Sequence, residues 1–212
     1  MSSTFLAALG GSQLYPLTDR LLSGFSHADQ VLQLSAGGAK LVQLREKIAT
    51  SAEFYESASS ALPAARAGGV KVIINDRVDI ALALKADGVH LGQDDLPAEA
   101  ARSLLGSDAI IGLSTHNLTQ AEAAARLPVD YIAIGPIFAT QSKENPDIPV
   151  GLNGLRLVRQ AVGQIPLVAI GGITLENYTS VLNAGADAVS VLSDIWQPQG
   201  QAEAQVKRFL AS

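Results

Sequence analysis

Gln43, Arg45 and Lys47 place an amide and two cations at the end of a short apolar run that reaches Leu44. Side chains alternate along an extended strand, so these three polar residues are expected on one side and Leu44 on the other. A surface strand has little reason to concentrate charge in this way. A guanidinium and an ammonium directed at one point suit a di-anionic phosphate. The segment therefore predicts a phosphate site.

Two aspartates could supply a metal site. Asp76 and Asp95 each follow an apolar run, Val72–Ile74 and Gly88–Leu91. Two carboxylates, together with phosphate oxygens and water, form the oxygen-rich ligand set that magnesium prefers. Aspartate at these positions also suits the N-cap of a following helix. Spacing alone leaves both interpretations open.

The elements that must position these residues form a regular alternation. Eight short apolar or β-branched runs recur at Leu14–Thr18, Leu41–Leu44, Val72–Ile74, Gly88–Leu91, Ile110–Ser114, Tyr131–Ile134, Leu167–Ile170 and Ala188–Leu192. Stretches with helical spacing lie between them, including Ala52–Ala67, Ala98–Leu105, Leu118–Leu127 and Gly154–Val162. Eight even units favour an α/β fold of the (β/α)8 TIM-barrel class over an open doubly wound sheet. We expect one barrel domain over residues 1–212, with residues 1–13 as an N-terminal extension.

In such a barrel the strand C-terminal ends face the active site. Polar clusters do follow the apolar runs, as in Asn75-Asp76-Arg77 and Ser114-Thr115-His116. Gly171-Gly172 after the seventh run and Ser193 after the eighth predict a cradle in which backbone amides approach a phosphate. Many unrelated barrels share this cradle, so it indicates a phosphorylated ligand without fixing a reaction.

Composition narrows the class of protein. With 212 residues and 48% apolar residues, the chain can bury one substantial core. A formal charge of −5 argues against a nucleic-acid surface. The absence of cysteine excludes disulfides, thiolate metal sites and a thiol nucleophile. The N-terminus has no signal-peptide pattern and no segment has the length of a membrane span, so a cytoplasmic protein with no membrane partner is expected.

Several segments, in order and with compatible spacing, resemble the thiamine phosphate synthase family. They are Gln43–Lys47, Ile74–Arg77, Gly88–Asp95, Gly112–His116, Gly135–Phe138, Lys143 and Ala169–Thr174, within a match from about Leu14 to Ile195. Each segment is a weak signal alone, but together they are highly specific. The resemblance implies a transferase of thiamine biosynthesis that joins hydroxymethylpyrimidine diphosphate to thiazole phosphate. Thiamine monophosphate and pyrophosphate are its products.

The resemblance also implies roles for individual residues. Asp76 and Asp95 would bind Mg2+, and Arg45, Lys47, Lys143 and Ser114 would be catalytic. The implied substrate-binding residues are Gln43, Leu44, Arg45, Glu46, Lys47, Asn75, Ser114, Thr140, Gln141, Ser142, Lys143, Gly172, Leu192 and Ser193. The chain departs from the family pattern at Ala139 and Ser142, where proline and threonine are usual, which puts loop rigidity in doubt rather than the reaction.

Other interpretations remain open. A thiazole tautomerase-like barrel resembles this family and uses a histidine near His116, but that branch lacks the paired aspartates and the loop lysine. A catalytically silent barrel that binds thiamine-pathway ligands, or a sugar-phosphate epimerase or isomerase, would not require the whole charged set. Lys143 taken alone also fits an ordinary loop lysine. His27 is expected to be exposed, and His90 to be a structural residue. The expected partners are the small-molecule substrates, and a homodimer is left open.

Overall fold

The computed structural model describes residues 4–140, 148–197 and 199–211. Its eight strands are β1 (Leu14–Pro16), β2 (Leu41–Leu44), β3 (Lys71–Asn75), β4 (Gly88–Leu91), β5 (Ile110–Thr115), β6 (Tyr131–Ile134), β7 (Leu167–Ile170) and β8 (Ala188–Val191). All paired strands are parallel, in the order β1-β8-β7-β6-β5-β4-β3-β2. A bridge between Leu17 and Gln43 joins β1 to β2. The predicted barrel is confirmed.

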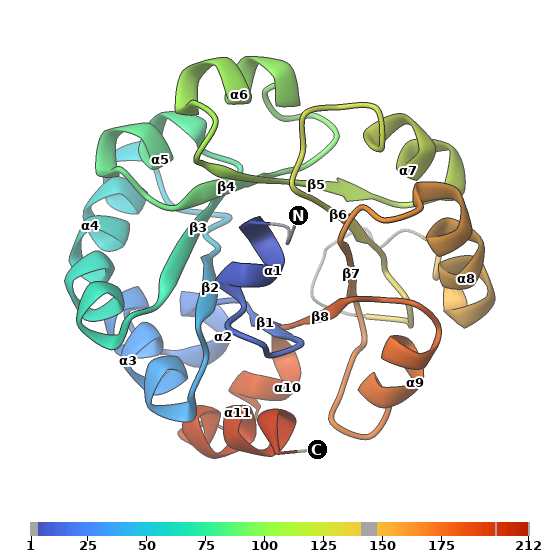
Figure 1. Ribbon diagram of the computed structural model, residues 1–212. Coiled ribbons are helices and arrows are strands. Elements are labelled where there is room, and N and C mark those ends of the chain that lie inside the picture. Colours follow the sequence, from blue (N-terminus) through green and yellow to red (C-terminus); the bar gives the residue numbers. More distant parts are fainter. Residues whose placement is uncertain (1–3, 141–147, 198, 212) are drawn as a thin grey trace.

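Helices other than α1 surround this ring of strands, as Figure 1 shows, and α1 lies within it. The helices are α1 (Thr4–Ala8), α2 (Arg20–Ser23), α3 (His27–Gly37), α4 (Ser51–Gly68), α5 (Val78–Leu84), α6 (Ala98–Leu105), α7 (Leu118–Ala124), α8 (Gly151–Val162), α9 (Tyr178–Asn183), α10 (Ser193–Trp196) and α11 (Ala202–Leu210). Local sequence explains their ends. In α4, Thr50 and Glu53 form a capping box, and Gly69 ends the helix in the left-handed region. Within the described ranges, none of the helices has the length and apolar character needed to cross a membrane.

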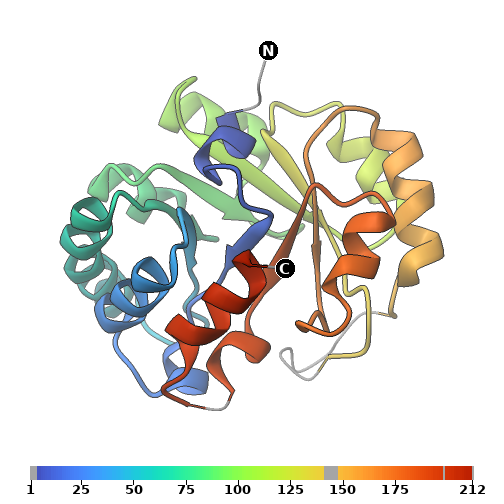
Figure 2. The same ribbon diagram turned by 60° about the horizontal axis from the view of Figure 1, so that its bottom comes forward.

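The barrel interior is filled at one end by α1, which lies over the middle of the ring (Figures 1 and 2). The Phe5 ring stacks on Tyr131 with a centroid separation of 4.1 Å, and it meets Tyr15 edge to face. These aromatic side chains are buried and belong to the core inside the strands. A second, larger core packs the outer faces of the strands against the helices. The N-terminal mouth is therefore packed, which leaves the opposite mouth for a ligand.

Candidate active site

Two adjoining cavities open at the C-terminal ends of the strands, with volumes of about 590 Å³ and about 100 Å³. Both are lined by Leu17, Arg45, Ser114, His116, Ile170 and Ser190. The larger cavity adds mainly polar residues, namely Tyr15, Gln43, Lys47, Asn75, Asp76, His90, Gln93, Asp94, Asp95 and Gln120. The smaller one adds Thr140, Gly171, Gly172, Leu192 and Ser193. The shared lining makes them two compartments of one site.

The three polar side chains at the end of β2 lie on one side of the strand, as the alternation predicts. Gln43, Arg45 and Lys47 all line the larger cavity, and Arg45 reaches the smaller one as well. The guanidinium of Arg45 pairs with Asp19 at 2.5 Å, and the Lys47 ammonium lies 2.6 Å from the Asp76 carboxylate. Both cations are thus held at the cavity wall by carboxylates and remain within reach of an anionic ligand.

Asp76 and Asp95 lie against each other although they follow different strands. Burial raises the pKa of Asp95, and the neighbouring Asp76 carboxylate raises it further, whereas the Gly92 amide and Lys47 act in the opposite sense. The Asp95 carboxylate accepts the Gly92 amide at 2.6 Å. Asp76 has φ +63°, a conformation that non-glycine residues adopt with strain and that is concentrated at functional sites.

The helix-cap interpretation of these aspartates is wrong. The N-cap residues of α5 and α6 are Arg77 and Pro97, and neither makes a side-chain cap. The chemistry of the donor set fits magnesium instead: two adjacent, partly desolvated carboxylates present hard oxygen ligands. Among the described residues no third histidine, aspartate or glutamate completes a cluster. The remaining ligands would therefore be phosphate oxygens and water, the arrangement that Mg2+ commonly takes.

Neutral polar groups complete the larger compartment. The Asn75 side chain is buried, and its Nδ2 has no hydrogen-bond partner among the described residues. A buried amide donor without a partner is costly, so this atom is suited to a ligand acceptor. Ser114 Oγ lies 2.8 Å from His90 Nε2, and Gln43 Nε2 donates to the Tyr15 hydroxyl at 3.1 Å. His90 is paired on both ring nitrogens, as its expected structural role requires.

The smaller compartment is shaped by two glycines. Gly171 and Gly172 have φ +99° and +64°. A Cβ on Gly172 would lie 2.7 Å from the Ala139 carbonyl oxygen and 2.8 Å from the Phe138 Cβ, so a side chain does not fit there. Thr140 and Ser193 bring hydroxyl groups to the same wall. No aspartate or glutamate is among the described residues that line this compartment, and glycine backbone beside hydroxyl groups suits a phosphate monoester.

Other predicted site residues lie elsewhere. Gln141, Ser142 and Lys143 fall outside the described residues. Leu44 and Glu46 do not line either cavity within the described part of the chain. Leu44 packs in the outer core, and the Glu46 carboxylate accepts Arg20 Nε at 2.6 Å. A substrate contact of these two residues would have to use the backbone.

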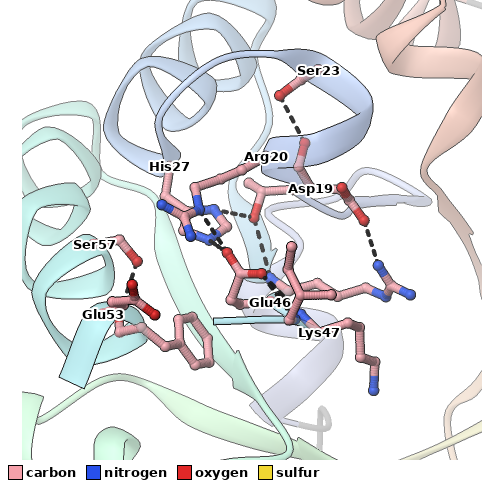
Figure 3. Close-up of polar contacts among 12 residues, drawn as sticks. Asp19, Arg20, Ser23, His27, Glu46, Lys47, Glu53 and Ser57 are labelled. Carbon is pink, nitrogen blue, oxygen red and sulfur yellow. Dashed lines mark hydrogen bonds and ion pairs between the residues drawn. The ribbon is translucent and has the colours of Figure 1, made fainter. Parts of the chain in front are cut away.

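Behind the cations lies a buried polar cluster that the sequence did not indicate. Figure 3 shows Arg20 and His27 beside Glu46. His27 is fully buried, so the expectation that it is exposed is wrong. The reason is that α3 turns this first residue inward, where Nδ1 lies 2.8 Å from the Thr18 hydroxyl. Thr18 in turn accepts the Arg45 amide at 3.2 Å, so the cluster supports the backbone that presents Arg45.

This cluster predicts a pH-dependent stability. Burial, opposed by Glu46, lowers the pKa of His27 from 6.5 to about 4, while Arg20 lowers it further and Asp19 raises it. Because the pKa of His27 is lower in the folded than in the unfolded protein, the contribution of this residue to the free energy of unfolding is complete at pH values above the unfolded pKa. The contribution is lost as the pH falls toward the folded pKa. Lowering the pH from about 7 to about 5 should cost roughly 2 kcal/mol from this residue. Urea denaturation of His27→Gln should show a correspondingly smaller loss of stability between these two pH values. The same dependence of stability on pH in the variant and the wild type would contradict the contribution of His27.

Comparison with known proteins places the chain in a family. The model of the family described as thiamine monophosphate synthase matches residues 14–195. A thiamine-phosphate synthase of Chloroflexus aurantiacus is 48% identical over 184 residues, covering 86% of this chain and 84% of the relative. One of Syntrophomonas wolfei is also 48% identical, covering 85% and 86%. The structure of a thiamine phosphate pyrophosphorylase from Pyrococcus furiosus superposes with a TM-score of 0.82 at 34% identity, covering 93% of each chain.

Proposed function

Because the chain belongs to the thiamine monophosphate synthase family, we propose that the two compartments are its catalytic site, the larger for a pyrimidine diphosphate and the smaller for a thiazole phosphate. The protein is a transferase of thiamine biosynthesis that joins these substrates to give thiamine monophosphate and pyrophosphate. The relatives favour this activity over a thiazole tautomerase-like or a catalytically silent barrel. The observation that carries the assignment of the site is the meeting of both compartments at Arg45 and Ser114.

The reaction breaks the bond between the pyrimidine methylene carbon and the diphosphate oxygen, and forms a bond from that carbon to the thiazole nitrogen. An electron-rich aminopyrimidine can carry the positive charge that develops on the carbon, so the protein need not supply a nucleophile. Stabilising the leaving group and orienting the two substrates are the remaining requirements. The absence of cysteine and the presence of cations at the cavity wall fit these requirements.

The charged wall would stabilise the leaving pyrophosphate. Arg45 and Lys47 would contact its oxygens, with Lys143 as the third proposed cation. Asp76 and Asp95 would hold Mg2+, which when bound supplies a positive charge to the diphosphate oxygens. The Asp76–Lys47 ion pair would keep the ammonium next to the metal ligands, so that cations of the protein lie beside the diphosphate.

The pyrimidine and thiazole would be held by neutral groups. Gln43, Asn75 and Ser114 would contact the pyrimidine diphosphate, supported by the unpartnered Asn75 amide. Gly172, Thr140, Leu192 and Ser193 would bind the thiazole phosphate, together with Gln141 and Ser142. Ser114 lines both compartments, which suits a residue close to the reacting pyrimidine carbon and thiazole nitrogen. The phosphorylated substrates do not cross bilayers unaided, and a cytoplasmic enzyme is accordingly proposed.

Gly172→Ala should raise the KM for thiazole phosphate by about tenfold with a smaller change for the pyrimidine diphosphate, because the added Cβ collides with the wall of the smaller compartment. Steady-state kinetics with each substrate varied in turn would measure this. Gly69→Ala is a matched control, since Gly69 has φ +63° with open space around its Cβ position and ends α4. Equal KM changes in the two variants would contradict the phosphate cradle.

The activity is tested by incubating the purified protein with both substrates and magnesium and identifying the products by mass spectrometry. Thiamine monophosphate and pyrophosphate in equal amounts are expected. Pyrophosphate without thiamine monophosphate would indicate a diphosphate hydrolase instead. Isomerisation of a thiazole substrate without coupling would support the tautomerase alternative, and His116, which contacts the Gly135 carbonyl at 2.7 Å, would be the residue to test.

A further inference from the structure

A continuous chain of hydrogen bonds crosses the barrel beneath the larger compartment. Gln43 Nε2 lies 3.1 Å from the Tyr15 hydroxyl, which lies 3.1 Å from the Tyr131 hydroxyl. The Tyr131 hydroxyl is 2.8 Å from His90 Nδ1, and His90 Nε2 is 2.8 Å from Ser114 Oγ. Gln43, Tyr15, His90 and Ser114 line the ligand cavity, whereas Tyr131 at the centre of the chain does not, and both tyrosines are buried.

The first bond fixes the direction of all the others. The Gln43 amide donates to Tyr15, so the Tyr15 hydrogen must find another acceptor, and the Tyr131 oxygen is the acceptor that the described residues offer. Tyr131 then donates to His90 Nδ1, which leaves the proton of the neutral imidazole on Nε2. His90 Nε2 donates to Ser114 Oγ. A break in this order would leave a buried hydroxyl hydrogen without an acceptor, which is costly.

The two ends of the hydrogen-bond chain therefore present one acceptor and one donor to the cavity. Gln43 uses its Nε2 in the chain and offers its carbonyl oxygen as an acceptor. Ser114 receives a hydrogen bond from His90 and offers its hydroxyl hydrogen as a donor. A 4-aminopyrimidine has the matching edge, because its amino group donates and the adjacent ring nitrogen accepts. In the deaminated 4-oxo ring both hydrogen-bonding roles are reversed, because the oxygen at position 4 accepts and the adjacent ring N–H donates.

We propose that the relay Gln43–Tyr15–Tyr131–His90–Ser114 makes the site selective for a 4-aminopyrimidine over its 4-oxo counterpart, with Tyr15 and Tyr131 as positioning residues that act through Gln43 and Ser114. This inference rests on the proposed function, because it assigns the pyrimidine to the larger compartment. It adds that selectivity depends on the direction of a buried hydrogen-bond chain as well as on the groups at the surface of the cavity.

The surroundings of the tyrosines support this role. The Tyr131 ring is stacked between Phe5 and His90, with centroid separations of 4.1 Å and 5.5 Å, so its hydroxyl has little freedom to move. Burial raises the pKa of both Tyr15 and Tyr131, which keeps each hydroxyl protonated and able to donate. Phenylalanine at position 131 would preserve the stacking and remove only the central link.

The test compares kcat/KM for the 4-amino and 4-oxo pyrimidine diphosphates in the wild type and in Tyr131→Phe. The wild type should prefer the amino substrate strongly, as sites built around a buried donor and acceptor do. Tyr131→Phe should reduce this preference by about tenfold or more, with little change in the KM for thiazole phosphate. Tyr15→Phe, which frees only the Gln43 end, should reduce it to a smaller extent. Tyr178→Phe is the matched control, because this buried tyrosine packs on Phe209 outside the relay.

An unchanged preference in both Tyr131→Phe and Tyr15→Phe would overturn the proposal. A second measurement does not depend on activity: nitrogen NMR of the histidine rings, with His90 assigned by its loss in His90→Asn. The relay predicts a neutral His90 with its proton on Nε2 in the wild type and a mixture of tautomers in Tyr131→Phe. A wild-type proton on Nδ1 would overturn the relay. A wild type that forms no thiamine monophosphate would overturn the proposed function instead, while the tautomer would still decide the relay.

Discussion

Asp95→Asn should lower kcat by at least about 100-fold at saturating substrates and millimolar magnesium, because the leaving pyrophosphate loses a metal-centred stabilisation of its charge. An amide has a similar shape but no charge, and it binds magnesium much more weakly than a carboxylate does. The fold should be retained, since the change removes a carboxylate that lies against Asp76 and is disfavoured there by burial. The expected result is a folded, nearly inactive protein whose residual activity requires far more magnesium.

Asp94→Asn is the matched control for this prediction. Asp94 is adjacent in the chain, carries the same charge and lines the same cavity, but its side chain is exposed. The magnesium dependence of the rate should remain close to that of the wild type in Asp94→Asn and should change greatly in Asp95→Asn. A large change in the magnesium dependence of Asp94→Asn and a small change in that of Asp95→Asn would assign the metal to Asp94. Wild-type kinetics in both variants would show that neither aspartate is needed to bind magnesium.

Lys47→Ala should lower kcat/KM for the pyrimidine diphosphate by about 100-fold, because a charge-assisted contact to the leaving group is lost from a partly desolvated site. The change also frees the Asp76 carboxylate, which now lies 2.6 Å from the ammonium, and so adds an uncompensated negative charge beside the diphosphate. Most of the effect should fall on the pyrimidine substrate and little on the KM for thiazole phosphate, since Lys47 does not line the smaller compartment. Steady-state kinetics with each substrate varied in turn would separate the effect on the pyrimidine diphosphate from the effect on the thiazole phosphate.

Lys71→Ala provides a closely matched control. Lys71 also makes a 2.6 Å ion pair with an aspartate, Asp87, and its side chain is 55% exposed against 48% for Lys47. It lies at the start of β3, at the opposite end of the barrel from the cavities. Exposed ion pairs contribute about 0–1 kcal/mol to stability, so this variant should keep nearly wild-type activity. Similar activity losses in both variants would mean that general destabilisation, rather than contact with the diphosphate, explains Lys47→Ala.

Periodicity in the sequence was sufficient to predict the barrel. The predicted bounds of β2, β4, β6 and β7 agree with the structure residue for residue, because each is a short buried run between clear turn signals. The first strand is shorter than predicted: it ends at Pro16, and Leu17 and Thr18 continue the run only as a bridge and a backbone hydrogen bond to Gln43 of β2. The helix predicted over Leu118–Leu127 ends at Ala124, since the alanine-rich stretch continues into a turn that periodicity does not distinguish from helix.

The site was only partly predictable, because contacts across the barrel are not encoded in local spacing. The position of Asp76 and Asp95 after neighbouring strands indicated that they could meet, and the alternation at Gln43 indicated which side chains share a wall. The burial of His27 depends on how α3 packs against the outside of the barrel, which no local pattern shows. Tyr15 and Tyr131 lie in the apolar runs predicted as the first and sixth strands, and their pairing across the barrel required the structure.

The most direct test of the central claim is the rate of pyrophosphate release from hydroxymethylpyrimidine diphosphate, measured with and without thiazole phosphate, in magnesium and in EDTA. Metal-assisted departure of the diphosphate from a two-compartment site predicts rapid release with both substrates and magnesium, and little release in EDTA. The released pyrophosphate should match the thiamine monophosphate formed. Equal rates in magnesium and EDTA, or no release by the folded protein under any condition, would contradict it.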